Sequence, residues 1–279
     1  MRRLIPQGLW ALTNRDLKKW YKVPFIFIVS LIQPLVWLAL FGKAMNISGL
    51  FNSVTGLPKE MVNQLGKQIM LSTFGTSDYF SFLAVGMLSF ISLFTAMFSG
   101  MSIVWDRRLG FLDKVLSTPV ARGVIPMAKI LATVIRALAQ AAIVLMLAII
   151  LGMDSSHITP FGLIVTFTAL FLLILGFASL FVTLALRSTS WESQMAIMNL
   201  LNLPILFSSN AMFPISYMPE WLQPIARINP ISYSADISRQ FLLNSPGMVD
   251  PILGLAYLTT FAITLLTLGI VLSWRYLSK

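Results

Sequence analysis

The sequence predicts an all-α integral membrane protein with six transmembrane helices. Hydrophobic residues form 57% of the 279-residue chain and charged residues only 11%, whereas soluble domains carry about 25% charged residues. Long apolar stretches recur along the chain, and a spanning helix needs about 20 such residues because the hydrocarbon core is about 30 Å thick. Membrane-spanning helices therefore account for the composition.

The elements follow from the apolar stretches and from the charges between them. Residues 1–22 interleave apolar side chains with bases, which predicts an amphipathic helix at the membrane interface; a solvated leader that only sets topology is the alternative. The third apolar stretch, 137–153, is short and must extend backwards past Arg136. One transmembrane domain, 1–279, is predicted to contain spans at about 23–42, 79–105, 128–153, 159–186, 193–218 and 251–274.

The distribution of charge orients these spans. An even number of crossings leaves both termini on one side, and 15 of the 20 Lys and Arg residues lie on that side. Six of the ten acids lie with the other five bases. By the positive-inside rule both termini are expected in the cytoplasm. The net charge of +10 is then explained by topology and anionic headgroups, and no nucleic-acid partner is expected.

The residues that usually carry chemistry are sparse. The chain has no cysteine, its single histidine is His157 in a short outer loop, and no acid lies inside a predicted span. No phosphate-binding loop of the form G-x-x-x-x-G-K-[ST] occurs. We expect no catalytic residue, no metal site and no cofactor bound by this chain. Arg136 is the one base that could lie in the bilayer, where it could line a path for an anionic group, bridge helices or snorkel to the headgroups.

The segment between the second and third spans predicts a short cytoplasmic amphipathic helix. Leu109, Leu112 and Leu116 recur at helical spacing, and Pro119 and Gly123 close the segment. An apolar ridge of this size suits the groove of a partner protein. A helix that rests on the membrane surface is the plainer interpretation.

This segment resembles the first cytoplasmic loop of type-2 ATP-binding-cassette (ABC) exporter permeases, such as the daunorubicin-resistance type. In that family the loop is a coupling helix that docks on the ATP-hydrolysing subunit. One residue departs from the pattern, because Arg108 stands where a second acid is usual. The residues for which the resemblance implies a coupling role are Asp106, Arg107, Gly110, Leu112, Leu116, Pro119 and Arg122.

A second match to the same family lies between the fifth and sixth spans. Asn229 before Pro230 is a good N-cap and first-turn pair for a helix, and the apolar residues before it predict another short helix. Two short helices that dip into the outer leaflet and return would explain the segment, and the family has this arrangement. The matching residues are Pro219, Trp221, Asn229, Pro230, Tyr233 and Arg239.

The resemblance also implies a substrate path lined by the second and fifth spans. Met87, Phe90, Phe94 and Phe98 recur at helical spacing in the second span, although ordinary helix packing would explain such a stripe equally. The fifth span is unusually polar, and polar groups in hydrocarbon must find partners or face a cavity. Its candidate lining residues are Asn199, Asn202 and Asn210.

Together these resemblances imply the permease subunit of an ATP-driven exporter in the plasma or inner membrane. It would pair with a second permease copy or a close paralogue and with two ATPase subunits, which would bind the ATP and Mg²⁺. A drug or lipid-like substrate is expected from the Phe/Met stripe, and a polysaccharide or lipid-linked glycan is the alternative. An ion-coupled carrier is disfavoured by the lack of acids in the spans, and a non-transporting scaffold stays open.

Overall fold

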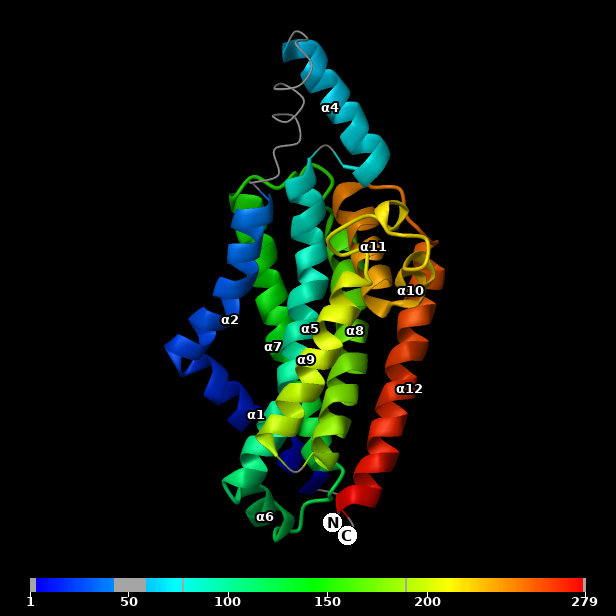
Figure 1. Cartoon of the computed structure of the whole chain (residues 1–279). Coiled ribbons are helices and arrows are strands. Elements are labelled where there is room, and N and C mark those ends of the chain that lie inside the picture. Colours follow the sequence, from blue (N-terminus) through cyan, green and yellow to red (C-terminus); the bar gives the residue numbers. More distant parts are fainter. Residues whose placement is uncertain (1–3, 43–58, 77, 189, 278–279) are drawn as a thin grey trace.

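The computed structural model describes residues 4–42, 59–76, 78–188 and 190–277, and these residues form helices and loops without strands (Figure 1). The predicted all-α class is confirmed. The elements are α1 (Leu4–Tyr21), α2 (Pro24–Trp37), the π-helical turn η1 (Leu38–Gly42), α4 (Lys59–Phe74), α5 (Tyr79–Arg108), α6 (Phe111–Leu116), α7 (Val124–Ile150), α8 (Pro160–Arg187), α9 (Trp191–Phe207), the 3₁₀ turn η2 (Ile215–Tyr217), α10 (Gln223–Ile228), α11 (Pro230–Leu243) and α12 (Pro251–Leu277).

Four helical stretches within the described residues are long and apolar enough to cross a membrane. They are Gln68–Arg108, which contains α5, then α7, α8, and Pro251–Ser273 of α12. The first predicted span, 23–42, corresponds to α2 together with η1, whose apolar part, Phe27–Leu40, is shorter than these four. The fifth corresponds to α9, which has 17 residues.

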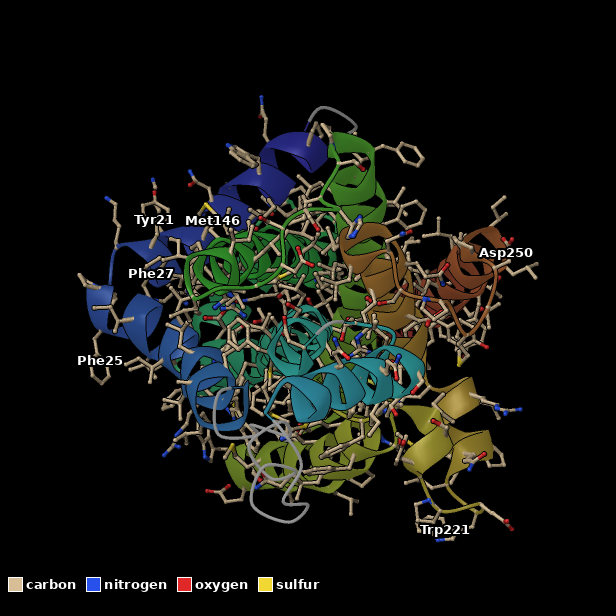
Figure 2. All side chains as sticks on the ribbon, turned by 90° about the horizontal axis from the view of Figure 1, so that it is seen from above. Tyr21, Phe25, Phe27, Met146, Trp221 and Asp250 are labelled. Atoms are coloured by element: carbon tan, nitrogen blue, oxygen red, sulfur yellow. The ribbon has the colours of Figure 1, made fainter. Side chains whose placement is uncertain are left out.

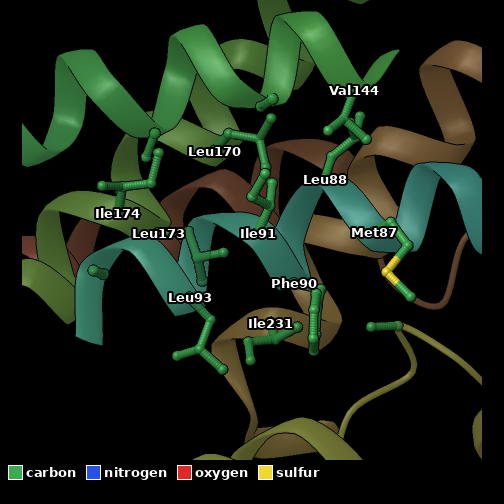
Figure 3. Close-up of a cluster of buried hydrophobic side chains, with 14 of the residues drawn as sticks. Met87, Leu88, Phe90, Ile91, Leu93, Val144, Leu170, Leu173, Ile174 and Ile231 are labelled. Atoms are coloured by element: carbon green, nitrogen blue, oxygen red, sulfur yellow. The ribbon is translucent and has the colours of Figure 1, made fainter. Parts of the chain in front are cut away.

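Helix α5 forms the centre of the bundle. It packs against α7, α8, α9 and α11, and almost all of its residues from Tyr79 to Val104 are buried. Figure 3 shows part of this core, where Leu88 of α5 lies near Val144 of α7, and where Leu170 and Leu173 of α8 belong to the same cluster. Helices α1 and α2 lie at one edge of the bundle and α12 at the other (Figure 1). Viewed from above, Tyr21 and Phe25 project from the outer edge (Figure 2).

The starts of the long helices are set by side-chain caps. Asp78 accepts a hydrogen bond from Ser81 N before α5, Thr159 accepts one from Gly162 N before α8, and Ser190 accepts one from Ser193 N before α9. Each cap gives a partner to a backbone N–H that the helix leaves unpaired. The predicted pair of Asn229 and Pro230 begins α11 in the same way, with Asn229 Oδ1 accepting from Ile231 N at 3.0 Å.

The fifth span differs from the prediction, because α9 ends at Phe207 and not near Met218. The residues that follow bond to α11 instead of continuing the helix. Asn229 Nδ2 donates to the backbone oxygens of Ile205 and Ser208 at 2.6 and 3.1 Å. Because Asn229 donates to these two carbonyls, they do not need the N–H groups of a continued helix. The polar residues after Phe207 therefore leave the helix.

The segment between the first two predicted spans contains a helix that the sequence analysis did not predict. Part of this segment forms α4, which lies beyond the ends of the long helices (Figure 1). Phe74 at its end packs edge-on against Tyr79 and Phe82 of α5, with ring centroids 5.3 and 5.1 Å away. The helix was missed because it carries no apolar run of spanning length. Residues 43–58 and Ser77 lie outside the described residues.

Candidate functional site

The predicted coupling helix is present as α6, which projects beyond the long helices (Figure 1). The beginning of α1 and the end of α12 lie at this same end of the bundle, which we call the α6 end. The start of α1, the loop that contains α6 and the end of α12 thus lie at one end of the bundle.

Gly110 makes the sharp change of direction between α5 and α6. Its φ is +66° and ψ is 10°, the left-handed conformation that side chains disfavour and that often ends a helix at glycine. Gly110 N donates to Arg107 O at 3.0 Å and so closes the last turn of α5. A Cβ at this position would meet open space, so backbone conformation and not crowding explains the glycine.

The predicted apolar ridge does not form one exposed surface. Leu109 is 70% exposed, but Leu112 is only 5% exposed and Leu116 packs against the core. Helix α6 therefore uses two of the three leucines to hold itself to the bundle. The exposed residues on α6 and beside it include Leu109, Asp113, Lys114 and Pro119, and Arg122 is exposed near the start of α7.

Asp106, predicted as part of the coupling motif, faces inward. Its side chain is 4% exposed and accepts two hydrogen bonds from Arg15, at 3.0 and 2.8 Å. Lys19 and Lys129 also donate to it, at 3.2 and 2.5 Å. Lys129 lies 2.7 Å from Asp16 as well. This carboxylate joins α1, α5 and α7, and it offers no surface for a partner protein.

Two neighbouring arginines strengthen the same junction. Arg15 lies over the ring of Phe111, 3.5 Å from its centroid, which links α1 to the start of α6. Arg107 donates to the backbone oxygens of Ser188 at 2.5 Å and of Leu186 at 2.9 Å. Those carbonyls lie at the end of α8, where the helix itself leaves them unpaired. The base of α6 is thus tied to α1 and α7 on one side and to the α8–α9 turn on the other.

Sequence reasoning missed the buried half of this junction. Arg15 and Lys19 belong to the basic leader and were assigned to lipid headgroups. Asp16, the single acid in that leader, was the available signal, because an acid among bases on an amphipathic helix often marks an ion-paired face.

The aromatic stripe of α5 borders a cavity of about 360 Å³, which we call the aromatic cavity. Phe90, Phe94 and Phe98 line it from α5, whereas Met87 is buried and does not line it. Helices α2 and α7 form the other walls, and Trp20 lies at the end of α1. The further lining residues are Phe25, Val29, Ser30, Gln33, Pro34, Ile91, Thr95, Arg136 and Gln140.

The three asparagines predicted with this stripe do not join it. Asn199 is exposed on α9, and Asn202 is half-buried, with an Oδ1 that has no partner among the described residues. Asn210 lies past the end of α9 and borders a separate cavity of about 300 Å³ at the end opposite α6, beside Phe74 and Asp236. The structure therefore separates all three asparagines from the aromatic stripe.

The predicted outer motif organises the segment before α12. Helices α10 and α11 precede α12, as expected. Arg239 is buried and donates to the backbone oxygens of Phe82, Asn210 and Ala211 at distances of 2.6 to 3.2 Å. This arginine provides the carbonyls after α9 with donors, so its role in the fold is to hold that irregular segment.

Three other members of the outer motif, Pro219, Trp221 and Tyr233, are at least partly exposed. Tyr233 stacks on Tyr257 of α12, with ring centroids 4.1 Å apart. Trp221 is 71% exposed and projects away from the bundle (Figure 2), and Pro219 beside it is exposed too. An exposed tryptophan at such a position is typical of the membrane interface.

The fold defines a helical protein of the multi-pass membrane class. Residues 7–243 match the model of the family described as ABC-2 type transporter, so the chain belongs to this family. Proteins of this kind are membrane subunits of ABC transporters, whose ATPase resides in a partner.

Named relatives agree with this assignment. The chain is 30% identical over 232 residues to ycf38, named as a transport permease, of Cyanophora paradoxa, covering 82% of this chain and 72% of that protein. It is 24% identical to nodulation protein J of Sinorhizobium fredii, covering 88% and 86%. It is 25% identical to the daunorubicin resistance ABC transporter permease protein DrrB1 of Streptomyces coeruleorubidus, covering 63% and 62%.

Proposed function

We propose that this chain is the membrane subunit of an ATP-driven exporter that moves a hydrophobic or amphipathic molecule out of the cytoplasm or the inner leaflet. Helices α2 with η1, α5, α7, α8, α9 and α12 provide the six crossings, and the α6 end faces the cytoplasm. Two permeases, identical or closely related, pair with two copies of a separate ATPase. Family membership and the position of α6 support this assignment.

The observation that carries the coupling role is the way α6 is anchored. Its exposed Leu109 is available to a partner, while Asp106 and Arg107 beside it join α1, α7 and the α8–α9 turn. A push on α6 by the ATPase therefore reaches three parts of the bundle through short charged contacts. In this proposal Leu109 and its exposed neighbours bind the ATPase, and Asp106 and Arg107 transmit the motion.

The aromatic cavity supports the substrate class. Most of its lining is apolar, with three phenylalanines contributed by α5, and such walls bind hydrophobic molecules mainly through burial of apolar surface. A glycan path needs more polar groups facing water. We therefore propose a drug-like or lipid-like substrate ahead of a polysaccharide or lipid-linked glycan.

Copurification tests the coupling role. The full-length permease is purified in mild detergent from native membranes, and ATP hydrolysis is measured in the eluate. Leu109→Asp places a charge on the proposed docking surface, and Trp221→Asp is the matched control, because Trp221 is equally exposed, at 71%, but far from α6. We expect an ATPase with the wild type and with Trp221→Asp, and loss of it with Leu109→Asp.

Two results would contradict the proposal. If no ATPase accompanies the wild type, the chain works as a carrier or scaffold. If Leu109→Asp retains the ATPase at the wild-type level, the docking surface lies elsewhere. Thermal unfolding of each variant shows whether a loss of ATPase comes from misfolding.

A further inference from the structure

Arg136 of α7 lies between two cavities and is incompletely paired. It lines the aromatic cavity, and it also lines a second cavity of about 140 Å³ at the α6 end, which we call the charged cavity. Trp20 borders both. The guanidinium makes one long hydrogen bond, from Nη2 to Thr95 O at 3.3 Å. Its buried Nε has no partner within the part of the chain that the structure describes.

The charges around the charged cavity do not balance. Asp16, Lys19, Lys129 and Arg136 line this cavity, and Asp106 and Arg15 complete the ion-pair cluster. Among the described residues that form this cluster, four bases face two acids. Both acids are already engaged, because Arg15, Lys19 and Lys129 each form an ion pair with Asp106 and with Asp16. Among the residues that the structure describes, no acid forms a close ion pair with Arg136.

Arg136 is half-buried, and partial desolvation of a cation without a paired acid is costly. An anion beside Arg136 and Lys19 would reduce the imbalance. Phosphate and carboxylate suit a guanidinium best, since they accept its parallel N–H donors.

The aromatic cavity indicates the other part of the ligand, an apolar chain. It adjoins Arg136 and continues along α2 and α5 past Phe94 and Phe98. Two of its α2 residues, Phe25 and Val29, are 75% and 47% exposed, so its wall reaches the outer surface of the bundle, where lipid chains lie. A flexible apolar chain can enter from that side without crossing the polar cluster.

We propose that these adjoining cavities bind one anionic amphiphile, with its phosphate or carboxylate head on Arg136 and Lys19 and an acyl chain in the aromatic cavity. The ligand comes from the leaflet at the α6 end. The site stands whether or not the chain works with an ATPase, so it goes beyond the proposed export function. The same chemistry fits a resident anionic lipid and an exchangeable amphiphile, which the experiment separates.

Binding is measured on the purified full-length protein by native mass spectrometry. Dioleoyl phosphatidic acid is the probe, dioleoyl phosphatidylcholine is the chain-matched reference, and inorganic phosphate tests the head alone. We expect phosphatidic acid to bind at least tenfold more tightly than either. Arg136→Gln should lose that preference by about tenfold, equivalent to about 1.4 kcal/mol. Arg136→Lys should retain part of it, since the charge remains.

Matched variants separate the head from the chain. Arg187→Gln removes one positive charge from an exposed position at the end of α8 and should leave binding unchanged. Val29→Trp fills the aromatic cavity and should weaken binding at least tenfold. Val36→Trp is its control, because Val36 lies on the same helix, is 45% exposed and does not line the cavity.

Lipids extracted from the purified protein identify the source. Enrichment of an anionic lipid in wild type over Arg136→Gln indicates a resident lipid, whereas binding of added phosphatidic acid without such enrichment indicates an exchangeable amphiphile. The proposal is overturned if Arg136→Gln binds phosphatidic acid as the wild type does, which would mean that water alone pairs Arg136. It is also overturned if Val29→Trp and Val36→Trp behave alike, which would place the acyl chain outside the cavity.

Discussion

Replacing Asp106 by alanine tests whether this residue holds the bundle together or binds a partner. The carboxylate is 4% exposed and accepts four hydrogen bonds, two from Arg15 and one each from Lys19 and Lys129. Its removal leaves several bases, Lys129 at 7% exposure among them, with less counter-charge in a buried place. Removing one partner of a buried pair costs about 3–5 kcal/mol, and we expect Asp106→Ala to lower the free energy of unfolding by this amount.

The assay is unfolding of the purified protein in mixed micelles of dodecyl maltoside and sodium dodecyl sulfate, followed by circular dichroism. Asp113→Ala is the matched control, since Asp113 is an exposed acid of the same segment, and it should change stability by less than about 0.5 kcal/mol. Adding Lys129→Met to Asp106→Ala should restore part of the loss, because one uncompensated charge disappears. Equal stability of Asp106→Ala and Asp113→Ala would refute the reasoning and return Asp106 to the docking surface.

Four other substitutions test the remaining contacts through the same unfolding assay. Arg107→Met should lower the free energy of unfolding by about 1–3 kcal/mol, because two charge-assisted hydrogen bonds to carbonyls at the end of α8 are lost from a half-exposed site. A variant as stable as the wild type would show that these bonds are unimportant. Gly86→Ala should lower the free energy of unfolding by about 3 kcal/mol or more, because its Cβ would lie 1.9 Å from Ala211 O. Gly110→Ala meets open space, and its left-handed backbone should make the loss only about 1–2 kcal/mol. A larger loss for Gly110→Ala than for Gly86→Ala would contradict the packing. Arg239→Lys keeps the charge but loses the planar fork, and should cost about 1–3 kcal/mol for each buried carbonyl left without a donor; an unchanged stability would mean that other groups replace the fork.

Family-level features were predictable because they depend on local patterns. Apolar runs of spanning length predicted α5, α7, α8 and α12, since no soluble fold could bury them. The pair of Asn229 and Pro230 predicted the start of α11, because capping needs only neighbouring residues. The motif around Gly110 predicted α6, whose turn depends on one backbone conformation.

The end of α9 could not be predicted in this way. A hydropathy window continues the span to Met218, but the carbonyls of Ile205 and Ser208 bond to Asn229, and those of Asn210 and Ala211 bond to Arg239. These donors are 21 to 29 positions away from the carbonyls in the sequence. Only the packing of α11 against α5 and α8 brings them near.

The sequence by itself determined that this chain is a helical membrane protein of the ABC-2 type, because composition, apolar periodicity and short motifs act within a few helical turns. Only the tertiary structure decided which charged residues face inward. Asp106 belongs to a motif that predicts partner binding, yet bases of α1 and α7 enclose it, and Arg136 lies between two cavities. The physical reason is that pairing between charges depends on distance in space, and residues 91 positions apart, as Arg15 and Asp106 are, become neighbours only when the helices pack.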